Sequence, residues 1–168
     1  SLKEINNNKS WIDWALDSHS QEINENYVKV IQFIFHDQWT RLREYCKRRE
    51  IRIIGDMPIY VGYDSADVYS NRCLFQLDNS GRMRYKSGCP PCDYQEGGQV
   101  WGNPLYKWEA HEESNFVWWK KRFSKLLEMV DVIRLDHFIG YHRYYRIPIN
   151  DRTAKNGEWI KSPGDKLF

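Results

Sequence analysis

Two short apolar segments, residues 51–56 and 131–136, each end in an aspartate, Asp56 and Asp136. Each segment follows a stretch in which apolar residues recur with helical spacing, so the pattern is that of a helix–strand repeat. In a parallel α/β sheet, the carboxyl ends of the strands open onto the face that carries the active site. We therefore expect both aspartates at one rim of such a sheet.

A (β/α)8 barrel builds its site in this way, but such a barrel usually takes about 250 residues. Only two repeats are recognisable in the 168 residues of this chain. The sequence therefore predicts an α/β fold, a partial (β/α)8 TIM barrel with a long loop or subdomain inserted between two barrel strands. Residues 1–168 would form part of one catalytic barrel domain, with residues 57–113 as the active-site loop or insertion and the rest of the barrel missing.

Periodicity and turn residues predict the individual elements. Apolar residues at three- and four-residue spacing predict a helix over residues 27–48 and a second helix that begins at Ser114 as its N-cap. Residues 1–20, with Trp11 and Trp14, have no regular pattern. The remaining predictions are a hairpin of residues 75–77 and 83–85, an extended segment at 144–148, and a turn at Asn156–Gly157 before residues 158–160.

Arg134 and Asp136 alternate with the apolar residues of their segment, so both side chains should lie on one face of the strand. An arginine at that distance holds a carboxylate ionised and oriented. A positioned, ionised carboxylate is what a retaining glycosidase needs as its nucleophile. The stretch alone leaves a second interpretation open, in which the Arg–Asp pair only closes the end of the strand.

The composition limits the possible partners. The net charge is +2, from 25 basic and 23 acidic residues, which gives no electrostatic reason to expect nucleic acid or an anionic membrane. No apolar run is long enough to span a bilayer. Eight Trp and eleven Tyr occur in a chain whose mean hydropathy is −0.77. Aromatic faces beside polar side chains suit sugars, although the same residues could form an ordinary core.

The pair Cys89 and Cys92 offers a rival hypothesis, because a Cys-x-x-Cys motif is typical of redox sites and of half a zinc site. A redox pair should open a helix, yet the residues that follow, Asp93 to Gly98, are typical of a loop. A structural zinc ion would need two further ligands, and the sequence has no second motif of this kind. We therefore expect no metal and no cofactor.

Five motifs then occur in a fixed order, at residues 53–61, 64–68, 98–106, 132–138 and 159–168. In order and approximate spacing they resemble the 4-α-glucanotransferases, the amylomaltase or disproportionating-enzyme family. The resemblance extends over nearly the whole chain. It implies an enzyme that transfers α-1,4-glucan segments between maltooligosaccharides by a retaining double displacement. The implied partners are maltooligosaccharides and the α-glucans of starch or glycogen, and the implied location is cytoplasmic.

The resemblance also implies roles for individual residues. Asp136 matches the nucleophile that forms the covalent glucosyl-enzyme, and Arg134 matches the residue that orients it. The implied substrate-binding residues are Asp56, Gln99, Trp101, Arg134 and His137. Of these, Asp56 and His137 match residues around the donor sugar, whereas Gln99 and Trp101 match a loop over the cleft.

The family pattern includes a Glu acid/base and a further Asp, both C-terminal to Phe168, where this chain ends. A retaining mechanism needs a second carboxyl roughly 5 Å from the nucleophile. We therefore expect the chain alone to be inactive, or to bind glucan without cleaving it. The chain departs from the family pattern at Cys92, Ile139, Tyr69 and Gly62–Tyr63, which puts details of acceptor binding in doubt.

Overall fold

The computed structural model describes residues 10–11 and 25–168, so most of the segment expected to be irregular, including Trp14, lies outside the described residues. The chain divides into two compact units. Unit 1 comprises Ser1–Met57 and Lys121–Arg134, and unit 2 comprises Pro58–Lys120 and Leu135–Phe168.

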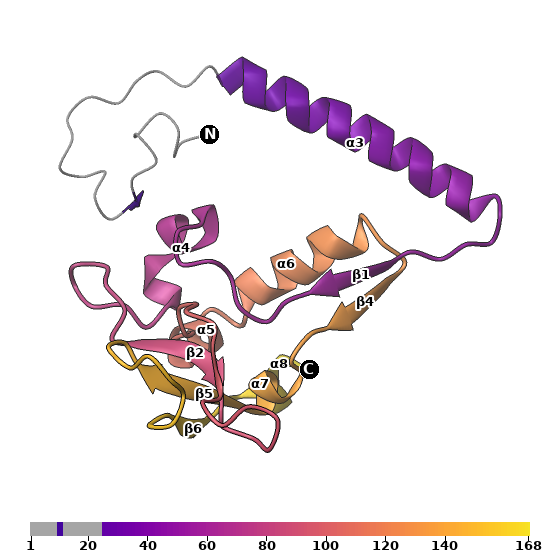
Figure 1. Cartoon of the computed structure of the whole chain (residues 1–168). Helices are drawn as coiled ribbons and strands as arrows, with labels where there is room; N and C mark the ends of the chain where they lie inside the picture. The colour runs from indigo at the N-terminus through magenta and orange to yellow at the C-terminus, as the bar shows by residue number, and fades with distance from the viewer. Residues whose placement is uncertain (1–9, 12–24) are drawn as a thin grey trace. The chain divides into compact units, whose positions relative to one another are not determined.

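Unit 1 contains the two predicted helix–strand repeats except for the first four residues of the second helix, which belong to unit 2. Helix α3 (Glu25–Lys47) precedes strand β1 (Ile54–Met57), and helix α6 (Val117–Leu127) leads to strand β4 (Val132–Leu135). The two strands pair with one another, and Figure 1 draws their arrows pointing the same way. The helix predicted over residues 27–48 is therefore confirmed, whereas the first strand begins three residues later than expected.

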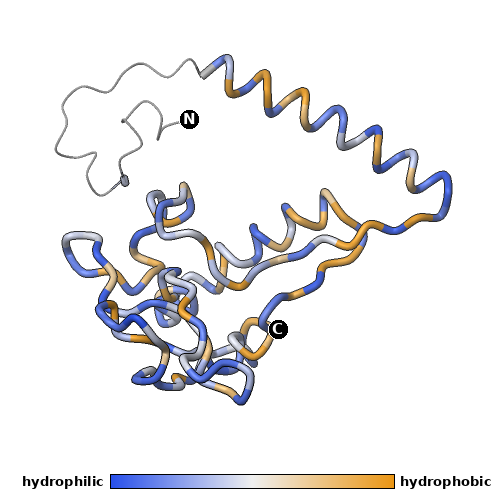
Figure 2. Tube along the Cα trace, viewed as in Figure 1, coloured by the Kyte–Doolittle hydropathy of each residue, from blue (hydrophilic) through white to orange (hydrophobic). Residues whose placement is uncertain are grey.

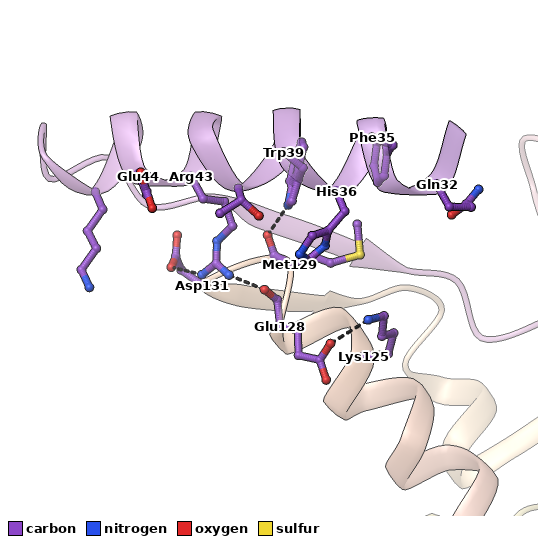
Figure 3. A pocket seen from close by; sticks show the side chains of 12 residues that line it. Gln32, Phe35, His36, Trp39, Arg43, Glu44, Lys125, Glu128, Met129 and Asp131 are labelled. Carbon is purple, nitrogen blue, oxygen red and sulfur yellow. Dashed lines mark hydrogen bonds and ion pairs between the residues drawn. The ribbon is translucent and has the colours of Figure 1, made fainter. Parts of the chain in front are cut away.

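The start of β4 is tied to α3 by side-chain hydrogen bonds. Trp39 donates its indole N–H to the carbonyl of Met129 at 2.8 Å, and Arg43 Nη2 donates to Asp131 Oδ1 at 3.0 Å (Figure 3). The other oxygen of Asp131 accepts the backbone N–H of Ile53 at 2.8 Å. The bonds from Ile53 and Arg43 lower the pKa of Asp131, and the Ile53 bond has the larger effect.

One apolar stripe of α3 is exposed in the part of the chain that the structure describes. Its members recur at three- and four-residue spacing and are 44–65% exposed, and Figure 2 shows hydrophobic residues recurring along the helix. They are Tyr27, Ile31, Ile34, Phe35, Leu42 and Tyr45. A helix normally buries such a stripe against another element.

Unit 2 is built on an antiparallel four-stranded sheet in the order β3–β2–β5–β6. The strands are β2 (Tyr85–Cys89), β3 (Gln99–Val100), β5 (Arg143–Pro148) and β6 (Glu158–Lys161). The extended segment at 144–148 and the turn before residue 158 are thereby confirmed. A Cβ at Gly88 would lie 2.1 Å from the carbonyl oxygen of Gln99, so β2 and β3 approach this closely only because the residue is glycine.

Short helices complete unit 2. They are α4 (Ala66–Ser70), the 3-10 helix η1 (Arg72–Leu74), α5 (Trp108–Glu113), α7 (Ile139–His142) and α8 (Gly164–Leu167). Less than half of the predicted 57–113 insertion is helix or strand, and its strands β2 and β3 belong to the same sheet as the C-terminal strands β5 and β6. The expectation that this segment is an active-site loop or insertion stays a prediction.

The predicted hairpin exists but is short. Leu77 and Met83 form a single antiparallel bridge, and Asp78 Oδ1 accepts the backbone N–H groups of Ser80 and Arg82 in the turn. Phe75 instead pairs with Tyr106, a residue 31 positions further along the chain.

The prediction that Ser114 caps a helix N-terminus is wrong. Ser114 follows α5, and its hydroxyl donates to the carbonyl of His111 at 2.9 Å. Asn115 and Phe116 then adopt positive φ values of 51° and 54°. Helix α6 therefore begins only at Val117.

Candidate functional site

The predicted site residues fall into two sets that belong to different units. In unit 1, Arg134 Nη1 donates to Asp56 Oδ2 at 2.6 Å. Pairing of β1 with β4 brings the two residues together. The side chains are 60% and 55% exposed, so the ion pair contributes at most about 1 kcal/mol to stability. An arginine and a carboxylate held at a strand end in this way offer donors and acceptors to sugar hydroxyl groups.

In unit 2, a cavity of about 420 Å³ contains three of the predicted residues, Trp101, Asp136 and His137. The other lining residues are Pro58, Ile59, Tyr60 and Asn103. They come from the segments that follow β1, β3 and β4, which are far apart in sequence. The cavity thus combines a carboxylate, an imidazole and an indole, which are groups that bind the polar rim and the apolar face of a sugar.

His137 has a strained backbone, with φ at 46°. Such a conformation in a non-glycine residue is often found at functional sites. Gly140 leaves room for the imidazole, because a Cβ there would lie 2.5 Å from Ile59 Cδ1 and 3.0 Å from His137 Cδ2. This packing gives a physical reason for the glycine four residues after Asp136.

Burial lowers the pKa of His137 below its usual range, although the charge of Asp136 acts in the opposite direction. The imidazole is therefore predominantly neutral at pH 7. Its buried Nε2 has no hydrogen-bond partner among the described residues. An unpaired polar atom buried beside a cavity is a feature that calls for an explanation and is common at functional sites.

The orientation of Trp101 is set by its neighbours. Its indole N–H donates to Gln99 Oε1 at 2.8 Å, and its ring meets the His137 ring with 4.7 Å between centroids. Its backbone N–H donates to the carbonyl of Ser87 at 3.0 Å. Gly102, at φ 77°, then turns the chain. Gln99, in strand β3, is thus linked to the cavity through Trp101.

Four cavity residues had no role in the sequence-based prediction, and two of them, Tyr60 and Asn103, carry polar groups on their side chains. Tyr60 lies within the first motif, four residues after Asp56, and Asn103 lies in a Gly-Asn-Pro turn. Asn103 donates from Nδ2 to the carbonyl of Val61 at 3.0 Å, which ties the loop to the segment after β1. Their position next to strand-end and loop residues was the only signal that could have identified them.

A larger hollow, of about 570 Å³, lies in unit 1 below α3 (Figure 3). It contains none of the predicted site residues. Its lining includes Phe35, Trp39 and Met129 beside the charged side chains of Arg43 and Lys125.

Cys89 ends β2, and Cys92 is exposed in the following loop. Burial raises the pKa of the Cys89 thiol, and the neighbouring Cys92 adds to the increase. Among the described residues, no group of three or more His, Cys, Asp or Glu side chains is arranged to hold a metal ion. The same part of the chain contains no helix long and apolar enough to cross a membrane.

The sequence matches the model of glycoside hydrolase family 77, described as 4-alpha-glucanotransferase, over residues 1–168. The chain belongs to this family. It is 46% identical over 172 residues to a 4-alpha-glucanotransferase of Aquifex aeolicus and 39% identical over 181 residues to that of Streptococcus pneumoniae. These matches include 95% and 100% of the chain but only 36% of each relative.

Solved structures of family members agree with the sequence comparison. The amylomaltase from Streptococcus agalactiae in complex with acarbose superposes with a TM-score of 0.90 at 39% identity, over 98% of this chain and 36% of that one. The amylomaltase from Corynebacterium glutamicum, at 19% identity and a TM-score of 0.73, shares the fold. The chain thus spans about a third of the length of its family relatives.

Proposed function

We propose that this chain is part of a 4-α-glucanotransferase that moves α-1,4-glucan segments between maltooligosaccharides. The observation that carries the proposal is the unit 2 cavity, in which Asp136, His137 and Trp101 line one hollow of about 420 Å³. The acarbose complex of the S. agalactiae amylomaltase supports a ligand of this class. Maltooligosaccharides and the α-glucans of starch or glycogen are the proposed substrates, and the cytoplasm is the proposed location.

The proposed reaction is a double displacement with Asp136 as nucleophile. Its carboxylate attacks the anomeric carbon of the donor glucan, and the bond from that carbon to the leaving 4-oxygen breaks as the oxygen takes up a proton. The 4-hydroxyl of a second glucan then attacks the glucosyl–Asp136 ester, loses its proton and releases the carboxylate. Two displacements at one carbon retain its configuration.

The proton must come from a second carboxyl roughly 5 Å from the nucleophile. In the family pattern this group is a Glu C-terminal to the residues that correspond to Leu167 and Phe168. Asp56, the first candidate to consider within the chain, forms an ion pair with Arg134. We assign Asp56 to binding of sugar hydroxyl groups. Arg134 is the proposed orienting residue of Asp136, and the neutral His137 is the proposed partner of a donor-sugar hydroxyl.

Trp101 would stack against the sugar beyond the scissile bond, with Gln99 fixing its indole ring. A sugar held there excludes water from the glucosyl-enzyme, so an acceptor glucan reacts in preference to water. This contact is the proposed reason why the enzyme transfers glucan instead of hydrolysing it.

The chain is proposed to be one part of a (β/α)8 barrel. It spans 36% of the relatives' length, and among the described residues the apolar stripe of α3 is exposed. Ile54 and Val132, in the paired strands β1 and β4, are also exposed. Further strands and helices of the longer protein would cover these surfaces. We call that longer protein the complete enzyme.

The test of this function uses Asp136→Asn in the complete enzyme, with disproportionation of maltotriose measured by chromatography of the products. We expect turnover to fall by several orders of magnitude and maltooligosaccharide binding to persist, because the amide cannot act as nucleophile. Asp165→Asn, at an exposed position in α8, is the matched control and should retain activity. Retention of most activity in Asp136→Asn would contradict the proposal.

A second experiment tests the 168 residues alone. Exposed apolar surface and unpaired strand edges favour aggregation over a cooperative fold, and the acid is outside the chain. We expect the isolated chain to be poorly soluble and to release no glucose from maltotriose. A sharp thermal transition together with transfer activity would show that an acid within the chain, Asp56 first, protonates the leaving group.

A further inference from the structure

Tyr60 is one of the residues that line the cavity, and its ring contacts the ring of Trp101. The centroids of the two rings are 6.1 Å apart, and the ring planes are inclined at 50°. On its other side Tyr60 stacks on Tyr106, with 5.9 Å between centroids and 16° between planes. The Tyr60 side chain is only 7% exposed. It therefore connects a cavity residue to the interior of unit 2.

Tyr106 is itself firmly held. Its side chain is 1% exposed, and its hydroxyl donates to the carbonyl of Ile59 at 2.6 Å. It contacts an aromatic cluster that consists of Phe75, Trp108, His111, Trp118 and Trp119. The ring of Tyr60 consequently rests on a rigid base.

At the cavity, the ring of Trp101 has few other supports. The backbone N–H of Trp101 is fixed by Ser87, but the preceding strand β3 has only two residues, and Gly102 follows with a positive φ. The indole orientation depends on the bond to Gln99 and on ring contacts with Tyr60 and His137. Gln99 is exposed, so the buried Tyr60 is the most constrained of these contacts.

We propose that Tyr60 is a positioning residue, whose ring holds Trp101 and, through it, His137 in the orientation that faces the sugar. The inference rests on the proposed function and extends it to a residue outside the predicted site. The role belongs to the ring. The buried hydroxyl of Tyr60 has no hydrogen-bond partner among the described residues, and burial without a partner costs stability. Phenylalanine at position 60 should therefore preserve the orientation of Trp101, whereas an aliphatic residue should not.

The experiment compares Tyr60→Phe, Tyr60→Leu and Tyr60→Met in the complete enzyme. Methionine fills much of the same volume without a flat ring and serves as a second variant if the leucine protein does not fold. The matched control is Tyr145→Leu. Tyr145 is 5% exposed and packs against Trp159 with 5.3 Å between centroids. The control therefore removes an equally buried tyrosine ring that supports a different tryptophan.

The first readout is the ¹⁹F NMR resonance of Trp101 in protein labelled with 5-fluorotryptophan, assigned with Trp101→Phe. We expect Tyr60→Leu and Tyr60→Met to shift or broaden this resonance, and Tyr60→Phe and Tyr145→Leu to leave it unchanged. The second readout is the ratio of transfer to hydrolysis with maltotriose. Loss of one aromatic contact should lower this ratio about tenfold in the leucine and methionine variants and should raise the KM for the acceptor.

An unmoved Trp101 resonance and an unchanged ratio in the leucine or methionine variant would overturn the inference. Tyr60 would then be an ordinary core residue, and its loss would lower the melting temperature as Tyr145→Leu does. Absence of transfer activity in the unsubstituted complete enzyme would instead refute the proposed function. The NMR readout needs no activity, so it still decides whether Tyr60 positions Trp101.

Discussion

The indole ring of Trp101 meets the imidazole ring of His137 almost at a right angle, with 86° between the planes and 4.7 Å between centroids. The two residues are 36 positions apart in the sequence, and both line the cavity with Asp136. The contact joins the loop that we assign to the acceptor with the residue that we assign to the donor sugar. A change at Trp101 should therefore affect both the acceptor and the reaction with water.

The first prediction concerns Trp101→Ala in the complete enzyme. Removal of the ring should lower the ratio of transfer to hydrolysis about tenfold, because one aromatic contact is lost and water gains access. The measurement is the ratio of longer maltooligosaccharides to total reducing ends formed from maltotriose. Trp159→Ala is the control, since that ring packs on Tyr145 in the β5–β6 pair. Equal ratios in the two variants would contradict a role for Trp101 in acceptor binding.

The second prediction separates stability from activity at the Asp56–Arg134 pair. Because both side chains are more than half exposed, Arg134→Ala should change the free energy of unfolding by at most about 1 kcal/mol. Disproportionation should nevertheless fall far more, because the residue is proposed to orient Asp136. Arg41→Ala provides a matched control, since Arg41 forms an exposed ion pair with Asp37 on α3. A loss of activity no greater than that of the control would contradict the proposed role of Arg134 in orienting Asp136.

The third prediction concerns the thiols. Cys89 and Cys92 are both free cysteines, and among the described residues no group of three or more His, Cys, Asp or Glu side chains is arranged to hold a metal ion. Joint replacement of Cys89 and Cys92 by Ala should leave maltotriose disproportionation and metal content unchanged. Stoichiometric zinc in the purified protein that disappears in the double variant would support the rival metal hypothesis.

The fourth prediction concerns the pH dependence of stability. Burial lowers the pKa of His111 from 6.5 to about 4, although the bond to the Leu74 carbonyl opposes the change. Between pH 6.5 and 4 the unfolded chain therefore binds a proton that the folded protein does not. Stability associated with His111 is complete above pH 6.5 and is lost as the pH falls towards 4. In thermal melts of the complete enzyme, the melting temperature should fall less between pH 6.5 and 4 in His111→Gln than in the unsubstituted enzyme.

His142→Gln is the control for this series, because His142 is exposed at the end of α7. It should keep the pH dependence of the unsubstituted enzyme. If His111→Gln and His142→Gln have the same slope, the buried imidazole is not the source of the acid sensitivity.

The spacing of apolar residues along the sequence was sufficient to predict the helices and strands that depend on neighbouring residues. Helical periodicity identified α3 to within two residues at its start and one at its end. The extended segment at 144–148 corresponds to β5. The recognised motifs also selected Trp101, Asp136 and His137, which the structure places around one cavity.

Such patterns could not predict which residues pair when they are far apart in the sequence. Tyr85 pairs with Pro148, and Phe75 pairs with Tyr106, so the sheet of unit 2 depends on contacts across 63 and 31 positions of sequence. The strands involved are short, and their periodicity is weak. Ser114 was misassigned for a related reason. Its residue type suits a cap, but the positive φ values of Asn115 and Phe116 delay the next helix.

The most direct test of the central claim is to locate the covalent intermediate. The complete enzyme would be incubated with 5-fluoro-α-glucosyl fluoride, which forms the glycosyl-enzyme and slows its breakdown, and then digested for mass spectrometry. The account predicts one added fluoroglucosyl group on the peptide that contains Asp136, and none in Asp136→Asn. A label on any other carboxylate, or the same label in Asp136→Asn, would contradict the assignment of Asp136 as the nucleophile.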